Sequence, residues 1–242
     1  MSGHSKWSNI KHKKEKSDAA KAKVFTKIGK EIAMAVKAGG PDPASNSKLK
    51  DCIAKAKANN VPNDNIDRII KKASGSDAVD YEEITYEGYG PSGIAVIVET
   101  TTDNRNRTGG EVRHYFDKYG GNLGQSGCVS FMFTTKGVIV IEKDDSVNED
   151  KLMEDSLESG AEDFQSDGDV YEIYTVPNDL MFVTDALREK GYTILSSEQE
   201  KIPANYVTLT DEEDIKKMTT LLEKLEENED VTDVYHNWEN QE

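Results

Sequence analysis

"YEGYGPSGIAVIVETTTDNRNRTGGEVRHYF", residues 86–116, contains two strands, a turn, a polar loop and a helix in one short stretch. Strand patterns cover Tyr81 to Glu87 and Ile94 to Thr100, and the Gly-Pro-Ser-Gly segment between them is typical of a turn. A helix is predicted from Arg105 or Gly109 to Tyr119, and a further strand from Val129 to Phe133. This order predicts a domain in which helices pack on a sheet.

The chain after this stretch contains a second set of strands and helices. Residues 137–201 follow a β-α-β-β-α-β order, which predicts a ferredoxin-like unit. Residues 205–209, 211–227 and 231–238 then add a strand, a helix and a strand, which alone are too small to bury the face of a sheet. We therefore expect them to return to the domain that begins at residue 76.

The chain before this stretch predicts three short helices. The first runs from Ser17 to the Gly39-Gly40-Pro41 stop, the second from about Ser47 to Ala58, and the third from near Pro62 to Ser74. At 100° per residue, the first helix places its apolar residues on one stripe and its lysines on the opposite side. The apolar stripe is Phe25, Ile28, Ile32 and Val36, and the lysine ridge is Lys23, Lys27, Lys30 and Lys37.

These patterns predict an α+β protein of three domains: an N-terminal three-helix domain and two α/β domains of the ferredoxin-like type, one inserted in the other. Residues 1–75 form the basic helical domain, with residues 1–16 as a mobile arm. Residues 76–134 plus 205–242 form one α/β domain, and residues 135–204 form the inserted one.

The charge of the chain is segregated. The net charge of the 242 residues is −16, yet residues 1–75 hold sixteen Lys and one Arg against seven Asp and Glu. Clustered cations of this kind are typical of a surface that binds a polyanion. The alternative is that the lysines only solvate a helical surface.

A set of basic and aromatic side chains is therefore predicted to bind nucleic acid. Trp7 in the arm can stack on a base, although a disordered tail with Trp7 packed on the domain is an alternative. The predicted residues are Lys6, Trp7, Lys11, His12, Lys13, Lys14, Lys16, Lys23, Lys27, Lys30, Lys37, Lys71 and Lys72.

Four motifs carry a resemblance to a known family. "GHSKWSNIKHKK", "NNVPNDNIDRIIKKASG", the stretch at 86–116 and "GGNLGQSGCVSFMF" resemble the YebC/PmpR family of bacterial proteins, whose mitochondrial relative is a translational activator of a cytochrome oxidase subunit. Cys128 stands where the family usually has Ser. The resemblance implies a cytoplasmic protein of three domains, which acts as a DNA-binding transcriptional regulator or, in a competing view, at the ribosome.

Catalytic residues are not predicted. The four histidines share no local motif with a carboxylate, serine or cysteine, and no phosphate-binding or metal-binding motif is found in the sequence. We expect no enzyme activity, no cofactor, no metal and no small-molecule substrate. Cys52 and Cys128 are interpreted as free thiols. Arg105 and Arg107 form a candidate second anion contact, with pairing to Asp103 or Glu111 as an equally supported alternative.

Two functions remain open at this stage. A transcriptional regulator would bind particular promoters in DNA. A translation factor would bind ribosomal RNA through its lysine-rich domain, and the scarcity of arginine favours this second reading because lysine acts mainly as a point charge on phosphate. No stretch reaches the roughly 20 apolar residues of a membrane span. We expect a cytoplasmic protein with nucleic acid, and the ribosome in the second reading, as its partner.

Overall fold

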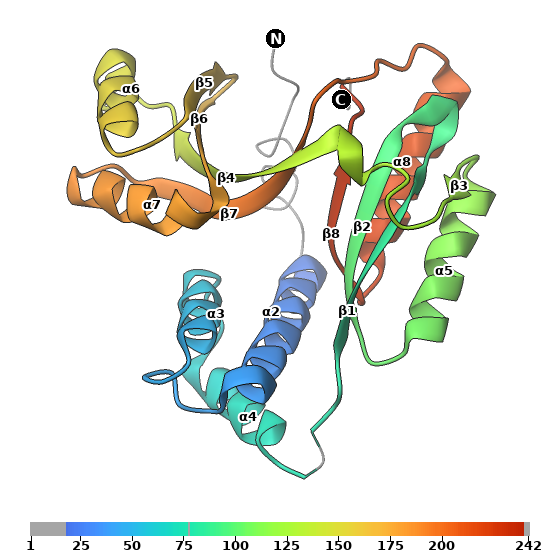
Figure 1. Cartoon of the computed structure of the whole chain (residues 1–242), viewed down its shortest axis with the longest axis horizontal. Coiled ribbons are helices and arrows are strands. Elements are labelled where there is room, and N and C mark those ends of the chain that lie inside the picture. The colour runs from blue at the N-terminus through green and yellow to red at the C-terminus, as the bar shows by residue number, and fades with distance from the viewer. Residues whose placement is uncertain (1–17, 77, 240–242) are drawn as a thin grey trace. The chain divides into compact units, whose positions relative to one another are not determined.

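The computed structural model describes residues 18–76 and 78–239, the side chains of residues 18–23 excepted. It contains helices and two antiparallel sheets, so the predicted α+β fold is confirmed (Figure 1). The chain divides into two compact units. Of the described residues, one unit contains 131–208 and 237–239, and the other contains 18–130 and 209–236.

Among the described residues three helices come first, and their apolar stripes pack together. They are α2 (Asp18–Gly39), α3 (Ser47–Ala58) and α4 (Asn63–Ala73). The predicted stripe of α2 is correct, because Ile28, Ile32 and Val36 are buried and Phe25 packs against them. Leu49 and Ala56 of α3 and Ile66 of α4 belong to the same core.

Asn46 joins the end of α2 to the start of α3. Its side-chain oxygen accepts a hydrogen bond from the Leu49 amide, which caps α3. Its amide nitrogen donates to the carbonyl oxygens of Ala35 and Gly40, at 2.8 Å each. Gly40 has φ of +85°, the left-handed conformation in which a helix commonly ends. One buried side chain therefore satisfies both helix ends.

The first sheet has the strand order β3-β1-β2-β8, with antiparallel pairing throughout. Its strands are β1 (Glu82–Tyr89), β2 (Ala95–Thr102), β3 (Asn122–Leu123) and β8 (Val231–His236). The helices that pack on it are α5 (Arg105–Lys118) and α8 (Glu212–Glu227). Because β8 pairs with β2, the end of the chain completes a sheet that begins at residue 82. The segment 205–209, expected as a strand, forms only a single bridge between Val207 and Trp238.

The strand predicted from Val129 to Phe133 is wrong. Residues 130–132 form one short helical turn, and Phe133 begins a strand of the second sheet. The cause is Glu87, whose buried carboxylate accepts hydrogen bonds from the amides of Gly127, Val129 and Ser130 at 2.8–3.0 Å. Amides that donate to a carboxylate cannot donate to a neighbouring strand, so the segment forms a loop.

The second sheet has the strand order β5-β6-β4-β7, which is the ferredoxin-like order expected for residues 137–201. Its elements in chain order are β4 (Phe133–Glu142), α6 (Glu149–Glu158), β5 (Asp163–Asp167), β6 (Val170–Thr175), α7 (Leu180–Glu189) and β7 (Ile194–Pro203). Ile139, Ile173 and Leu187 lie in its core with no more than 1% exposure. The first sheet differs, because its chain order starts with a β1–β2 hairpin. The exact boundaries of the three domains stay a prediction.

Candidate nucleic-acid interface

Part of the predicted interface lies outside the described residues. This holds for all of the arm residues and for the side chain of Lys23. The arm residues are Lys6, Trp7, Lys11, His12, Lys13, Lys14 and Lys16. The described part of the predicted interface therefore consists of Lys27, Lys30 and Lys37 on α2 and of Lys71 and Lys72 on α4.

The position of the ridge lysines opposite the apolar stripe predicts that they face solvent, but of those whose side chains are described, Lys27 and Lys30 do not. Lys30 is buried at 9% exposure, so for this residue the prediction is wrong. Lys27 is half-buried and donates from Nζ to the carbonyl oxygen of Thr232 in β8, at 2.6 Å. Lys37 is exposed and pairs with Asp80, just before β1. Each lysine thus meets an acceptor from the first sheet or from the segment that leads into it.

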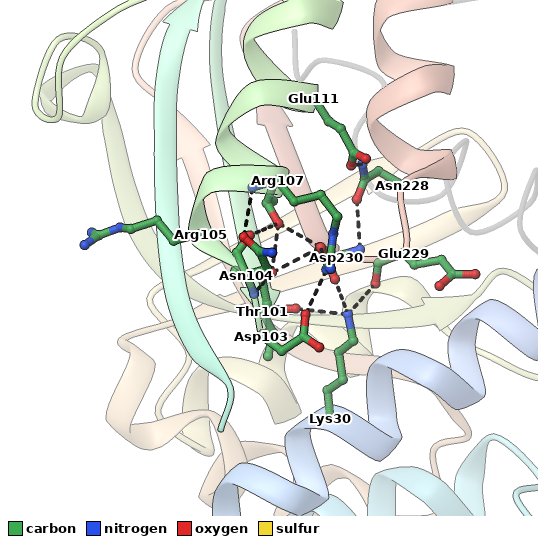
Figure 2. A network of polar contacts seen from close by, with 12 residues as sticks. Lys30, Thr101, Asp103, Asn104, Arg105, Arg107, Glu111, Asn228, Glu229 and Asp230 are labelled. Carbon is green, nitrogen blue, oxygen red and sulfur yellow. Dashed lines mark hydrogen bonds and ion pairs between the residues drawn. The ribbon is translucent and has the colours of Figure 1, made fainter. Parts of the chain in front are cut away.

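Lys30 lies at the centre of a polar network (Figure 2). Its Nζ donates to Oδ1 of Asp230 at 2.6 Å and to the carbonyl oxygens of Glu229 at 2.9 Å and Thr101 at 3.0 Å. These three bonds use all three donors of the ammonium group. Lys30 belongs to α2, whereas Thr101 belongs to β2 and Asp230 precedes β8. The network therefore fixes the helical region against the sheet.

Asp230 is the matching hub on the sheet side. Its Oδ2 accepts hydrogen bonds from Arg107 at 2.6 Å, Thr108 at 2.7 Å and Thr102 at 3.1 Å. Burial by itself would raise the pKa of Asp230, but the hydrogen bonds from Lys30, Arg107 and Thr108 outweigh it and hold the pKa well below its usual value. The carboxylate is therefore charged at neutral pH, although only 8% of its side chain is exposed.

The two arginines of the candidate anion contact have different surroundings. Arg107 pairs with Asp103 at 2.9 Å and with Asp230, so the predicted alternative of pairing with a neighbouring acid holds for Arg107. These hydrogen bonds raise its pKa above the usual value. Arg105 is exposed, and Figure 2 shows its side chain pointing away from the network. The structure does not bring the two arginines together.

Within residues 24–76, the exposed cations other than Lys37 of α2 lie on α3 and α4. Lys71 and Lys72, both predicted, are exposed at the end of α4. Lys50 and Lys57 of α3 are also exposed, and seven residues of spacing put them on the same side of the helix. Lys50 and Lys57 are not among the residues that were predicted to bind nucleic acid. Their outward position on α3 was the available signal, because the apolar positions Leu49 and Ala56 point inward.

Other kinds of site receive little support from the described residues. Within residues 18–76 and 78–239, no group of three or more His, Cys, Asp or Glu is placed to hold a metal ion. A cavity of about 290 Å³ lies between α2, α3 and the first sheet, and charged side chains of both signs line it. None of the described helices is both long and apolar enough to span a membrane.

Comparisons with known proteins cover nearly the whole chain. The family model described as "TACO1/YebC protein N-terminal domain" matches residues 5–76, and the model described as "TACO1/YebC second and third domain" matches residues 81–238. A relative from Ruminiclostridium cellulolyticum is 63% identical over 243 residues, which are 100% of this chain and 98% of the relative. A relative from Acetivibrio thermocellus is 61% identical over 239 residues, 98% of this chain and 99% of the relative. Both are named "Probable transcriptional regulatory protein".

A solved structure supports the same assignment. The crystal structure of a conserved hypothetical protein from Aquifex aeolicus superposes with a TM-score of 0.83 at 45% identity, over 93% of this chain and 92% of the other. The fold and the polar network define an α+β protein whose lysine-rich helical region is held against one of two antiparallel sheets. The chain belongs to the TACO1/YebC family, so the family expected from the four motifs is confirmed.

Proposed function

We propose that this protein regulates gene expression by binding nucleic acid through the exposed cations of α3 and α4, together with the basic residues that precede α2. One observation supports this most directly: α3 and α4 carry a net positive charge, whereas the residues of the second sheet and its helices carry a net negative charge. Residues 47–73 contain seven Lys and Arg against three Asp, whereas residues 131–208 contain six against eighteen Asp and Glu. A local excess of exposed cations releases the counterions of a nucleic acid when it binds.

The names of the relatives favour DNA as the target. Two relatives that share more than 60% of their residues with this chain are named as transcriptional regulators. In this reading the helical region contacts the phosphates and fixes the position of the protein on the duplex.

A second candidate is a translation factor that binds ribosomal RNA. Residues 1–75 contain sixteen Lys but only Arg68 as arginine. Arginine is the residue that most often reads guanine in the major groove of DNA, whereas lysine contacts phosphate as a point charge. A surface built almost wholly of lysine therefore suits a backbone whose sequence is not read.

The interface is tested by reversing two charges on α3. In Lys50→Glu/Lys57→Glu, both substitutions are exposed and leave the apolar stripe of α3 unchanged. We expect affinity for a short DNA duplex and a short RNA, measured by fluorescence anisotropy, to fall at least about tenfold, because each charge-assisted contact contributes roughly 1.5–3 kcal/mol. The matched control is Lys151→Glu/Lys216→Glu, which reverses two exposed lysines on α6 and α8. Equal loss in both variants, or no loss in the first, would contradict the proposal.

The two targets are separated by co-sedimentation with ribosomes in near-physiological salt and excess random-sequence DNA. Wild type in the ribosome pellet, with the α3 variant left in solution, supports the translation reading. Binding to a particular promoter at least about 10³-fold tighter than to random DNA, without co-sedimentation, supports the transcription reading.

A further inference from the structure

The helix α2 has two opposite faces that are both covered. Its apolar face packs against α3 and α4, and its lysine face lies toward the first sheet. The lysine face makes polar contacts with the sheet side. They comprise the ion pairs of Lys30 with Asp230 and of Lys37 with Asp80, and the hydrogen bond from Lys27 to the Thr232 carbonyl. These contacts differ from those of a hydrophobic core because they join charged and polar groups.

The acceptors on the sheet side present the chemistry of a phosphate group. Lys30 binds one carboxylate oxygen and two carbonyl oxygens within 3.0 Å, and Lys27 binds another carbonyl oxygen. A phosphate also offers charged and strongly accepting oxygens to lysine. Lys30 therefore uses its three donors either on the sheet or on a nucleic-acid backbone, but not on both at once. A phosphate that binds Lys27 or Lys37 competes with the acceptor that each has on the sheet side.

The contact between α2 and the sheet is also incompletely packed. The cavity of about 290 Å³ lies beside it, with Glu31, Lys48 and Lys55 on the helical side and Glu83, Glu99 and Asp233 on the sheet side. Contacts between domains that are polar and loosely packed generally permit relative motion. A buried ion pair contributes little net stability because its desolvation offsets its attraction, yet loss of one partner is strongly unfavourable. The contact between α2 and the first sheet therefore has the properties of one that opens when a competing ligand replaces one partner of the ion pair.

We infer that Asp230, Asp80 and the carbonyl oxygens that accept from Lys27 and Lys30 form a reversible latch over the lysine face of α2, and that nucleic-acid phosphates compete with this latch for Lys27, Lys30 and Lys37. This inference rests on the proposed function, because it assigns the regulation of the same helical region. With the latch closed, only the cations of α3, of α4 and of the segment before α2 are available to bind nucleic acid. With the latch open, α2 adds its lysines to the interface.

The test is Asp230→Asn, which keeps the shape of the side chain but removes the charge opposite Lys30. The matched control is Glu229→Gln, which removes one charge from the adjacent residue while its carbonyl oxygen remains for Lys30. Glu229 is exposed, and its carboxylate points away from the network in Figure 2. Opening is measured by energy transfer between dyes at Asn59→Cys and Asp117→Cys, two exposed positions on the helical and sheet sides, with Cys52 and Cys128 replaced.

In Asp230→Asn we expect less energy transfer without any nucleic acid, and about fivefold to tenfold tighter binding to a short single-stranded RNA and to a DNA duplex. The gain arises because affinity rises as the binding-competent fraction rises. The dependence of affinity on salt should also become steeper by at least one phosphate contact. Glu229→Gln should match wild type in all three measurements.

The inference is overturned if folded Asp230→Asn binds no tighter than Glu229→Gln, or if its energy transfer equals that of wild type. If Asp230→Asn opens but none of the proteins binds either nucleic acid, the proposed function fails and the competition fails with it, while the latch is supported. Should Asp230→Asn not fold, Asp80→Asn serves in its place. Asp80 has 80% side-chain exposure and pairs with Lys37, so its loss should tighten binding about twofold without unfolding the protein. No tightening in folded Asp80→Asn would then overturn the inference.

Discussion

Glu87 shows how one buried side chain can determine a segment of chain forty residues away. Its carboxylate, 6% exposed, accepts amide hydrogen bonds from Gly127, Val129 and Ser130. Burial opposes the charge, but these amides outweigh that effect and lower the pKa of Glu87. The residue is thus an organiser of the loop that leads from the first sheet to the second.

Replacing this carboxylate should destabilise the first sheet. In Glu87→Gln, an amide NH₂ group replaces one of the two oxygens that accept these hydrogen bonds. Because an NH₂ group cannot accept from a backbone N–H, we expect the free energy of unfolding to fall by about 2 kcal/mol. Urea unfolding followed by circular dichroism measures this. Glu83→Gln, at an exposed position of the same strand, is the control and should change stability by less than about 0.5 kcal/mol. Equal effects in the two variants would mean that the carboxylate does not hold the loop.

At the scale of elements, the sequence predicts a structural feature well when the residues that determine it lie close together in the chain. The stripe Ile28, Ile32 and Val36 follows from helical periodicity, because its partners α3 and α4 come next in the chain. Periodicity also places Lys30 opposite this stripe, but it does not show what covers that face. Asp230 lies 200 residues away. Residues 129–133 were predicted as a strand for the same reason, since their apolar pattern carries no trace of Glu87.

The junction between α2 and α3 gives a prediction at this scale. Asn46→Ala removes the cap of α3 and both bonds to the end of α2, and we expect a loss of about 2–3 kcal/mol in the free energy of unfolding. Asn46→Asp keeps the cap but loses the two donated bonds, so it should lie between Ala and wild type. Thermal unfolding of the two variants beside Asn59→Ala, an exposed amide at the end of α3, provides the comparison. An Asp variant as unstable as the Ala variant would show that the donated bonds, and not the cap, carry the effect.

At the scale of the whole molecule, the buried charges make stability depend on pH. The pKa of Asp230 is lowered by folding from a usual value of 3.8. Its contribution is therefore complete above the unfolded pKa and is lost as the pH falls through the folded pKa. The contribution is lost because, at low pH, the Asp230 carboxylate binds a proton more readily in the unfolded chain than in the folded one.

We therefore expect the difference in unfolding free energy between wild type and Asp230→Asn to be constant from about pH 7 to 5 and to shrink as the pH falls below about 4. Urea midpoints at a series of pH values measure it. Comparing the two proteins removes the contribution of the acidic groups whose surroundings are the same in both. A difference that stays constant to about pH 2 would contradict the assigned lowering of this pKa.

The distance along the chain between Lys30 and Asp230 has a consequence during synthesis. The chain is made from its N-terminus, and the 200 residues that separate the two partners take about 10–40 s to add at about 5–20 residues per second. In the later part of this interval, once α3 and α4 have been made, α2 can already fold on them, while neither Asp230 nor β8 exists. Each newly made molecule thus passes through a stage in which its lysine face is uncovered beside the RNA of the ribosome that is making it.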